Sequence, residues 1–284
     1  MIPAQFGYQR PASLDEALNA ISSSDDGVKV IAGGQSLLPL LKMRLASAGT
    51  LVDIGRIAEL RGIRPQPDGG MEIGALTTYA ELLDSTRLEI AIEAISDIGD
   101  VQVRNRGTVG GAIAHADPAS DLPAVGLALD YSAVLRSRRG ERVVPLDGFF
   151  KGAFETDMQP DELLVAIRRG PLPAGMGGAY MKLAQPASGY SIVGVAAVVA
   201  KTGGLVSHIR VAITGVGDVA YRARAVEEAL SGSDGSAAAV AAAAGQSTDG
   251  VTVAGDIHAD NAYRTQMAVV YTRRALEAAL SRSA

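Results

Sequence analysis

The pattern of strands and helices in this 284-residue chain changes at one uncharged segment, residues 170–178, which contains two prolines and four glycines. Such a composition predicts a linker. Before it, short apolar runs alternate with stretches of helical periodicity, which is typical of an α/β arrangement. After it, three apolar runs are separated only by short turns, which predicts an antiparallel meander. We therefore expect an α+β chain with two domains, residues 1–175 and 176–284.

The expected elements follow from capping motifs and periodicity. Ser13 with Glu16, and Thr78 with Glu81, have the spacing of a capping box, in which the hydroxyl residue precedes a helix. In the N-terminal part, the pattern predicts strands at 28–32, 51–54, 71–75 and 163–167, a hairpin of 134–136 with 142–146, and helices at 88–98 and 124–129. In the C-terminal part, it predicts strands at 179–183, 190–200 and 205–214 and helices at 222–230, 236–244 and 263–280.

The composition excludes several classes of protein. The chain has no cysteine, so it forms no disulfide and cannot ligate an iron–sulfur cluster or a cysteine-bound zinc. Its formal net charge of −5 argues against nucleic-acid binding. The longest strongly apolar run, residues 192–200, is shorter than the roughly 20 residues of a membrane span. The N-terminus lacks the pattern of a signal peptide, and we expect a cytoplasmic protein.

Two glycine pairs are the first functional candidates. Gly33 and Gly34 follow a predicted strand and precede Ser36, whereas Gly110 and Gly111 follow Thr108. Paired glycines allow a positive φ and close approach of a ligand, and successive backbone N–H groups can bind a phosphate. Each pair alone is more typical of a simple tight turn than of a ligand site. Neither fits the Walker A or the G-x-G-x-x-G pattern, so a Rossmann nicotinamide site is not supported.

Two further polar segments have both a functional and a structural interpretation. In residues 115–123, Asp121 is suited to accept hydrogen bonds from sugar hydroxyls and Ser120 to donate to a polar ligand atom; alternatively, either residue caps the following helix. The group Asp256, His258 and Asp260 resembles a metal site, but capping of the last helix by Asp260 is the favoured interpretation. No catalytic triad is evident, and we predict neither a catalytic nor a metal-ligating residue.

Taken together, these motifs resemble the FAD-binding medium subunit of molybdenum hydroxylases, especially the carbon monoxide dehydrogenase medium-chain type, a family that includes the xanthine dehydrogenase FAD domain. The resemblance extends over the whole chain and is carried by residues 32–46, 102–125, 186–197 and 263–276. It implies a two-part α/β FAD-binding domain like that of vanillyl-alcohol-oxidase (PCMH-like) flavoproteins, with subdomains of about 1–55 and 56–175. A C-terminal domain with a three-stranded antiparallel sheet and helices follows.

The resemblance also implies which residues bind FAD. The two glycine loops would wrap its diphosphate, Asp121 would lie at the ribityl or phosphate region, and Tyr190 would lie beside the isoalloxazine ring. Gln35 and Ala112 depart from the residues common in the family, but backbone donation would survive both changes. The implied cofactor-binding set is Ala32, Gly33, Gly34, Gln35, Ser36, Leu37, Thr108, Gly110, Gly111, Ala112, Ser120, Asp121, Leu164, Lys182 and Tyr190.

The activity implied by the resemblance is electron transfer within a heterotrimer, often doubled. A large subunit would hold the molybdenum cofactor, a small subunit would hold two [2Fe–2S] clusters, and the FAD of this chain would pass their electrons to an external acceptor. Neither substrate nor acceptor follows from this chain, and quinone, oxygen, NAD and an electron carrier all remain open as acceptors. A location at the inner face of the membrane is compatible with this role. The alternatives are a stand-alone FAD-dependent oxidoreductase acting on a small organic substrate, and a scaffold subunit without cofactor.

Overall fold

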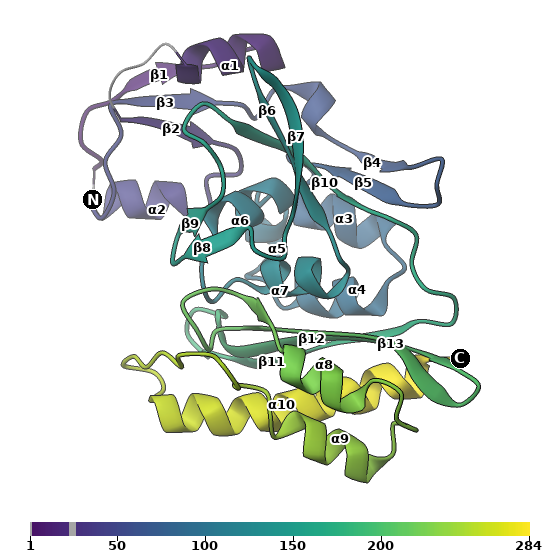
Figure 1. The fold of residues 1–284 in the computed structure, drawn as a ribbon. Coiled ribbons are helices and arrows are strands. Elements are labelled where there is room, and N and C mark those ends of the chain that lie inside the picture. Colours follow the sequence, from purple (N-terminus) through teal and green to yellow (C-terminus); the bar gives the residue numbers. More distant parts are fainter. Residues whose placement is uncertain (1, 23–26) are drawn as a thin grey trace.

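The structure, a computed structural model, describes residues 2–22 and 27–284 (Figure 1). It has the mixed helix and strand architecture expected from the sequence. A three-stranded sheet and a five-stranded sheet occupy the N-terminal part, a four-stranded sheet the C-terminal part, and a short two-stranded hairpin completes the set. No helix within the described ranges is both long and apolar enough to cross a bilayer.

The first sheet is parallel and has the order β1 (Gly7–Gln9), β3 (Thr50–Asp53), β2 (Val28–Ile31). Helix α1 (Leu14–Ser22) packs Ala17, Leu18 and Ile21 against Val52 and Ile54. The predicted hydroxyl cap is confirmed, since Ser13 Oγ accepts a hydrogen bond from the Glu16 N–H at 3.2 Å. Helix α2 (Leu37–Lys42) directly after β2, and the 3-10 helix η1 (Ala58–Leu60), were not predicted.

The second sheet is antiparallel and has the order β4 (Ile63–Pro65), β5 (Met71–Gly74), β10 (Leu163–Arg169), β6 (Ser132–Ser137), β7 (Gly140–Pro145). The Thr78–Glu81 capping box is present in full at the start of α3 (Tyr79–Ser85). The predicted helix at 124–129 begins earlier, because α7 (Asp121–Ala128) includes the buried Asp121. The remaining elements are α4 (Glu89–Ser96), α5 (Val101–Arg104), α6 (Val109–His115), β8 (Phe150–Gly152) and β9 (Glu155–Thr156).

The C-terminal part contains the predicted meander, β11 (Gly177–Ala184), β12 (Ser191–Thr202) and β13 (Leu205–Thr214), and a two-residue edge strand, β14 (Tyr221–Arg222), is added to it. The three predicted helices are confirmed as α8 (Arg224–Leu230), α9 (Ala237–Ala244) and α10 (Asn261–Arg282). Figure 1 shows this sheet as a layer between α4 and α7 on one face and α8 to α10 on the other.

Strand β12 is buried on both faces. Val195 and Val199 face the cluster formed with α8, α9 and α10, whereas Ala196 and Val198 join the core of the N-terminal part. Because neighbouring side chains of a strand point to opposite faces, a strand covered on both sides is apolar at every position. This two-sided burial explains the apolar run that the sequence shows at residues 192–200.

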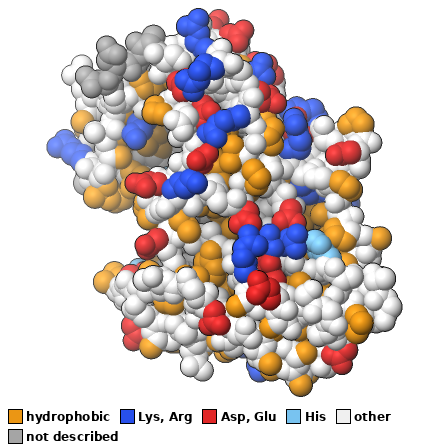
Figure 2. Space-filling view, in the orientation of Figure 1, with side chains coloured by type: hydrophobic (Ala, Val, Ile, Leu, Met, Phe, Trp, Pro, Cys, Tyr) orange, Lys and Arg blue, Asp and Glu red, His pale blue; other side chains and the backbone are white. Residues whose placement is uncertain are grey.

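Charged pairs close the rim of the contact between the two parts. Arg210 of β13 pairs with Asp130, which follows α7, at 2.9 Å, and Arg222 and Arg224 both pair with Asp147. Figure 2 shows basic and acidic side chains lying side by side at this junction. Exposed pairs of this kind each contribute little, so the contact rests mainly on its apolar interior.

We predict that Glu93 contributes more to stability than its neighbour Glu89. The Glu93 carboxylate accepts the backbone N–H of Tyr180 at 2.7 Å and a guanidinium N–H of Arg282 at 2.6 Å. Glu93→Ala leaves that N–H without its acceptor and should lower the free energy of unfolding by about 1–3 kcal/mol in chemical denaturation of the full chain. Glu89 bonds Arg282 alone from a largely exposed position, so Glu89→Ala should cost about 0–1 kcal/mol. Equal effects of the two substitutions would contradict the assignment.

Candidate functional site

The first glycine loop, between β2 and α2, presents a run of unused backbone donors. Among the described residues, no oxygen accepts a hydrogen bond from the N–H groups of residues 33–37. The loop is half-buried except at Gln35, which is exposed, and Gly34 has a φ of +75° that favours glycine. Consecutive N–H groups along such a turn are suited to bind an anion.

The second glycine loop is different, because its donors bond to the protein itself. Thr108 is the N-cap of α6, and its Oγ accepts the Gly111 N–H at 3.1 Å. The N–H of Val109 bonds the carbonyl of Thr77, and that of Gly110 bonds the carbonyl of Ala75. The hypothesis that both loops offer a row of free donors is therefore borne out for the first loop alone.

The two loops lie against each other, and glycine is required for that contact. A Cβ added to Gly33 would be 2.1 Å from the carbonyl oxygen of Arg106, and one added to Gly110 would be 2.4 Å from the Cβ of Ala75. Real Cβ atoms do not approach other atoms so closely, so these glycines permit contact between two segments of the protein. The sequence hypothesis gave both glycines to ligand approach; their packing role was missed.

Asp121 is the centre of a buried polar network. One carboxylate oxygen accepts from the Tyr180 hydroxyl at 2.5 Å and from the Ser191 hydroxyl at 2.8 Å, and the other accepts from Lys182 at 3.0 Å. Burial raises the pKa of Asp121, while Lys182 and the hydroxyl donors oppose that rise. The capping interpretation holds in position only: Ser120 is the N-cap residue of α7 but makes no side-chain bond to the helix, and Asp121 does not cap it.

Tyr190, in the C-terminal part, lies close to the first glycine loop. The residue is 43% exposed, and the Ser36 side chain of the first loop lies near enough to its hydroxyl to influence its pKa. Burial and the nearby carboxylate of Asp117 raise the pKa of Tyr190. Ser36 of the first loop and Tyr190, which directly precedes β12, are thus neighbours, although more than 150 positions separate them in the sequence.

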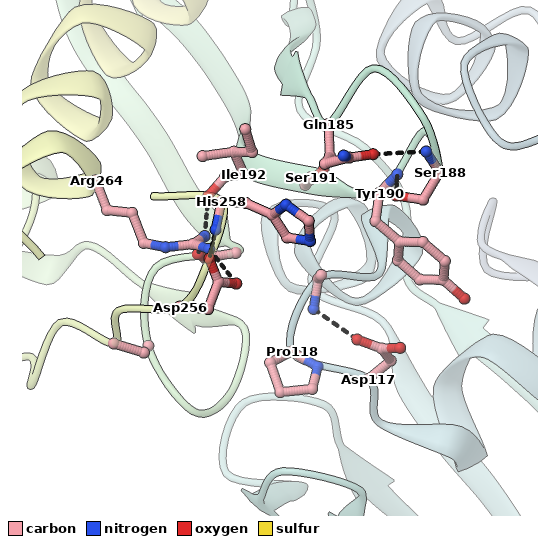
Figure 3. Close-up of a pocket in the computed structure, with 14 residues that line it drawn as sticks. Asp117, Pro118, Gln185, Ser188, Tyr190, Ser191, Ile192, Asp256, His258 and Arg264 are labelled. Carbon is pink, nitrogen blue, oxygen red and sulfur yellow. Dashed lines mark hydrogen bonds and ion pairs between the residues drawn. The ribbon is translucent and has the colours of Figure 1, made fainter. Parts of the chain in front are cut away.

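A cavity of about 330 Å³ adjoins Tyr190. Figure 3 shows the Tyr190 ring extending from the turn that also carries Gln185 and Ser188, with His258 at the centre of the view. The opposite wall includes Asp256 and Arg264, which form an ion pair at 2.6 Å. Within the described part of the chain there is no group of three metal-ligating side chains. The predicted cap is confirmed, because Asp260 accepts the Tyr263 N–H at 2.7 Å.

The remaining predicted residues are placed as follows. The side chains of Leu164 and Ala112 are buried at 5% and 8% exposure, so both pack into the protein interior. Ala32 precedes the free donors of the first loop, and Leu37 carries the last of them. Sequence reasoning missed Tyr180 and Ser191 as site residues. A signal existed for Ser191, which directly follows Tyr190, but Tyr180 lies in an apolar strand and looks like an ordinary core residue.

Comparison with known proteins agrees with this geometry. Residues 4–171 match the family model described as the FAD binding domain in molybdopterin dehydrogenase. Residues 178–279 match the family model of the CO dehydrogenase flavoprotein C-terminal domain. The carbon monoxide dehydrogenase medium chain of Hydrogenophaga pseudoflava is 41% identical over 100% of both chains. A 6-hydroxypseudooxynicotine dehydrogenase complex subunit alpha from Paenarthrobacter nicotinovorans is 38% identical over 100% of this chain and 97% of that protein. A solved Hydrogenophaga pseudoflava carbon monoxide dehydrogenase, lacking the Mo-pyranopterin moiety, superimposes with a TM-score of 0.96 over 100% of both chains at 43% identity.

We predict that Gly33 is needed for folding even without a ligand. Gly33→Ala places a methyl group against the carbonyl of Arg106, which should lower the free energy of unfolding of the ligand-free chain by about 1–3 kcal/mol. Gly170→Ala is the matched control, because nothing lies within 4 Å of its added Cβ and its φ is not positive. Urea denaturation of both variants measures the difference. If Gly33→Ala unfolds like the parent chain, the two loops do not need this contact.

Proposed function

Because the chain belongs to the family of FAD-binding medium subunits of molybdenum hydroxylases, we propose that it carries FAD and transfers electrons within such a complex. Electrons reach this FAD from [2Fe–2S] clusters on a small subunit, and an external acceptor takes them up. A large subunit holds the molybdenum cofactor and the substrate, and the complex is a cytoplasmic dimer of heterotrimers. Since this chain has no cysteine, the clusters must be ligated by a partner. We also propose that its own two domains meet between β10 and β11, near residue 175.

The observation that carries the proposal is the row of N–H groups at residues 33–37 without an acceptor in the described structure. A diphosphate offers oxygens with full negative charge, which are strong acceptors for such donors. The residues present therefore fit the diphosphate of FAD. Ala32 and the second loop, at Thr108 and Gly111, would complete the walls around it.

The other proposed contacts follow from position. Tyr190 is an exposed aromatic residue close to Ser36 of the donor row, so it is suited to lie against the isoalloxazine ring. Lys182, Asp121 and Ser120 lie on the segments that join the two parts beside this ring. When bound, FAD supplies the reversible electron chemistry, while the protein binds it, orients it and controls access. No acid or base among these side chains is required for electron transfer.

The cavity beside Tyr190 is the place at which we propose that the external acceptor approaches. It opens next to the ring that would cover the flavin, and its walls mix polar groups, such as Asp117 and Gln185, with backbone at Gly215 and Gly217. A cavity of about 330 Å³ falls within the range of small-molecule sites. Substrate oxidation on another subunit leaves this cavity free for the acceptor.

We predict flavin in the complex purified with its partner subunits, in amounts equal to this chain, and retained through backbone donors. Gln35→Ala keeps every N–H and should retain FAD as the parent does. Gln35→Pro removes one donor from the row and should weaken FAD binding by about tenfold or more, as expected for a lost hydrogen bond to a charged group. Visible flavin absorbance after gel filtration measures both. A parent complex without flavin bands refutes the proposed function, and equal retention by the two variants refutes the backbone role.

We predict that filling the cavity blocks the acceptor and leaves the cofactor in place. Ala254 lines the cavity and is partly exposed, so Ala254→Phe should occupy it. Flavin content should stay unchanged while the rate of acceptor reduction falls several-fold. Ala242→Phe, at an exposed position of α9, is the matched control and should leave both quantities unchanged. Normal acceptor reduction by Ala254→Phe would show that the acceptor approaches elsewhere.

A further inference from the structure

A buried ion pair joins the two parts of the molecule where the apolar contact ends. Asp121 begins α7, Lys182 lies on β11, and their side chains are 6% and 2% exposed. Lys182 also donates to the carbonyl of Asp97 at 3.1 Å, so its ammonium bridges two segments of the N-terminal part. Electron transfer does not require this ion pair, so we infer that the pair holds neighbouring segments in place.

Two hydroxyl groups extend this pair toward β12. The Tyr180 hydroxyl and the Ser191 hydroxyl donate to the same oxygen of Asp121 and lie 3.3 Å from each other. Gly194 makes room for them, because a Cβ there would be 2.2 Å from the Tyr180 hydroxyl. The three donors therefore orient one carboxylate completely, and a residue with any side chain at position 194 would disturb them.

Ser191 connects this network to Tyr190, the residue before it. The backbone N–H of Ser191 donates to the carbonyl of Ala119 at 3.3 Å, which ties the same residue to the loop before Asp121 a second time. Tyr190 is also the last residue of the turn formed by residues 185–190. A hydrogen bond from the Gln185 N–H to the Tyr190 carbonyl, at 2.8 Å, closes this turn. The turn contains Gly189 with a φ of +73° and is exposed at residues 186–188, whereas Ser191 beside the tyrosine is buried.

We propose that Tyr180 and Ser191, acting through Asp121, are positioning residues that hold Tyr190 beside the first glycine loop. They thereby determine how tightly the flavin is bound and how close the Tyr190 ring lies to it. The inference rests on the proposed function, since it concerns the site where FAD binds. It adds to the proposed cofactor contact of Asp121 a second role, as the shared acceptor of three protein donors. It differs from a purely structural role, which would affect stability without involving Tyr190.

The test compares Tyr180→Phe and Ser191→Ala, each removing one hydroxyl, in the purified complex containing the full chain. Each should speed FAD release about tenfold and change the quenching of bound flavin fluorescence, because Tyr190 loses its fixed position. Both substitutions are then repeated in a Tyr190→Ala background, where they should have no further effect on either quantity. Tyr221→Phe is the matched control: it removes a half-buried hydroxyl that donates to the carbonyl of Ser247, and it should leave FAD release unchanged.

Each outcome decides the proposal. Loss of the effect in the Tyr190→Ala background supports positioning through Tyr190. An effect that persists in the Tyr190→Ala background shows that the network acts on FAD by another route, and it overturns the proposal. Unaltered FAD release by both single variants, with a lower melting temperature, also overturns the proposal. A parent complex that contains no FAD refutes the proposed function instead, so the two failures are distinct.

Discussion

The burial of the C-terminal sheet on both faces is the constraint on which the rest of the structure depends. Its one face packs against α10, and its other face packs against α4 and α7 of the N-terminal part. A shift of the sheet would expose apolar surface on both faces at once, and each Å² exposed would cost about 25 cal/mol of folding free energy. The ends of its strands are therefore held relative to α7. At one such end, Thr214 donates to the carbonyls of Pro118 and Ser120 at 2.7 and 2.9 Å, beside the network around Asp121.

Apolar packing alone does not determine the orientation of the segments at its edge, because the hydrophobic effect is not directional. The hydrogen bonds of the network around Asp121 are directional, so they determine this orientation. A buried ion pair pays a desolvation penalty that its own attraction often fails to offset, unless hydrogen bonds satisfy the remaining lone pairs. Here Tyr180 and Ser191 do so for one oxygen and Lys182 for the other. With these bonds the pair favours one arrangement of the chain beside the proposed flavin site.

Local periodicity was sufficient to predict most of the fold. The meander, the hairpin and the long C-terminal helix each carry their own pattern, whereas β1 and β14 are too short to have one. The site was predicted as a set of loops, but the role of single residues inside it was not. Gly33 needs to be glycine because Arg106 lies against it, and Asp121 meets partners 59 to 70 positions away. A sequence pattern contains no record of such contacts, so the local reading of Asp121 as a helix cap was the wrong one.

The positions at which this chain departs from its family bear on the scaffold alternative. Its only support was Gln35 and Ala112. Gln35 is exposed, and it belongs to the donor row through its backbone, which is independent of the side chain. Ala112 is buried at 8% exposure on α6, where the first-turn N–H groups already bond protein oxygens. Neither substitution therefore removes a donor from residues 33–37. The row keeps its shape through Gly34, with its φ of +75°, and through the contact of Gly33 with Arg106. The donor row on which the proposed function rests is thus intact in this chain, which favours a cofactor-binding subunit over a scaffold without cofactor.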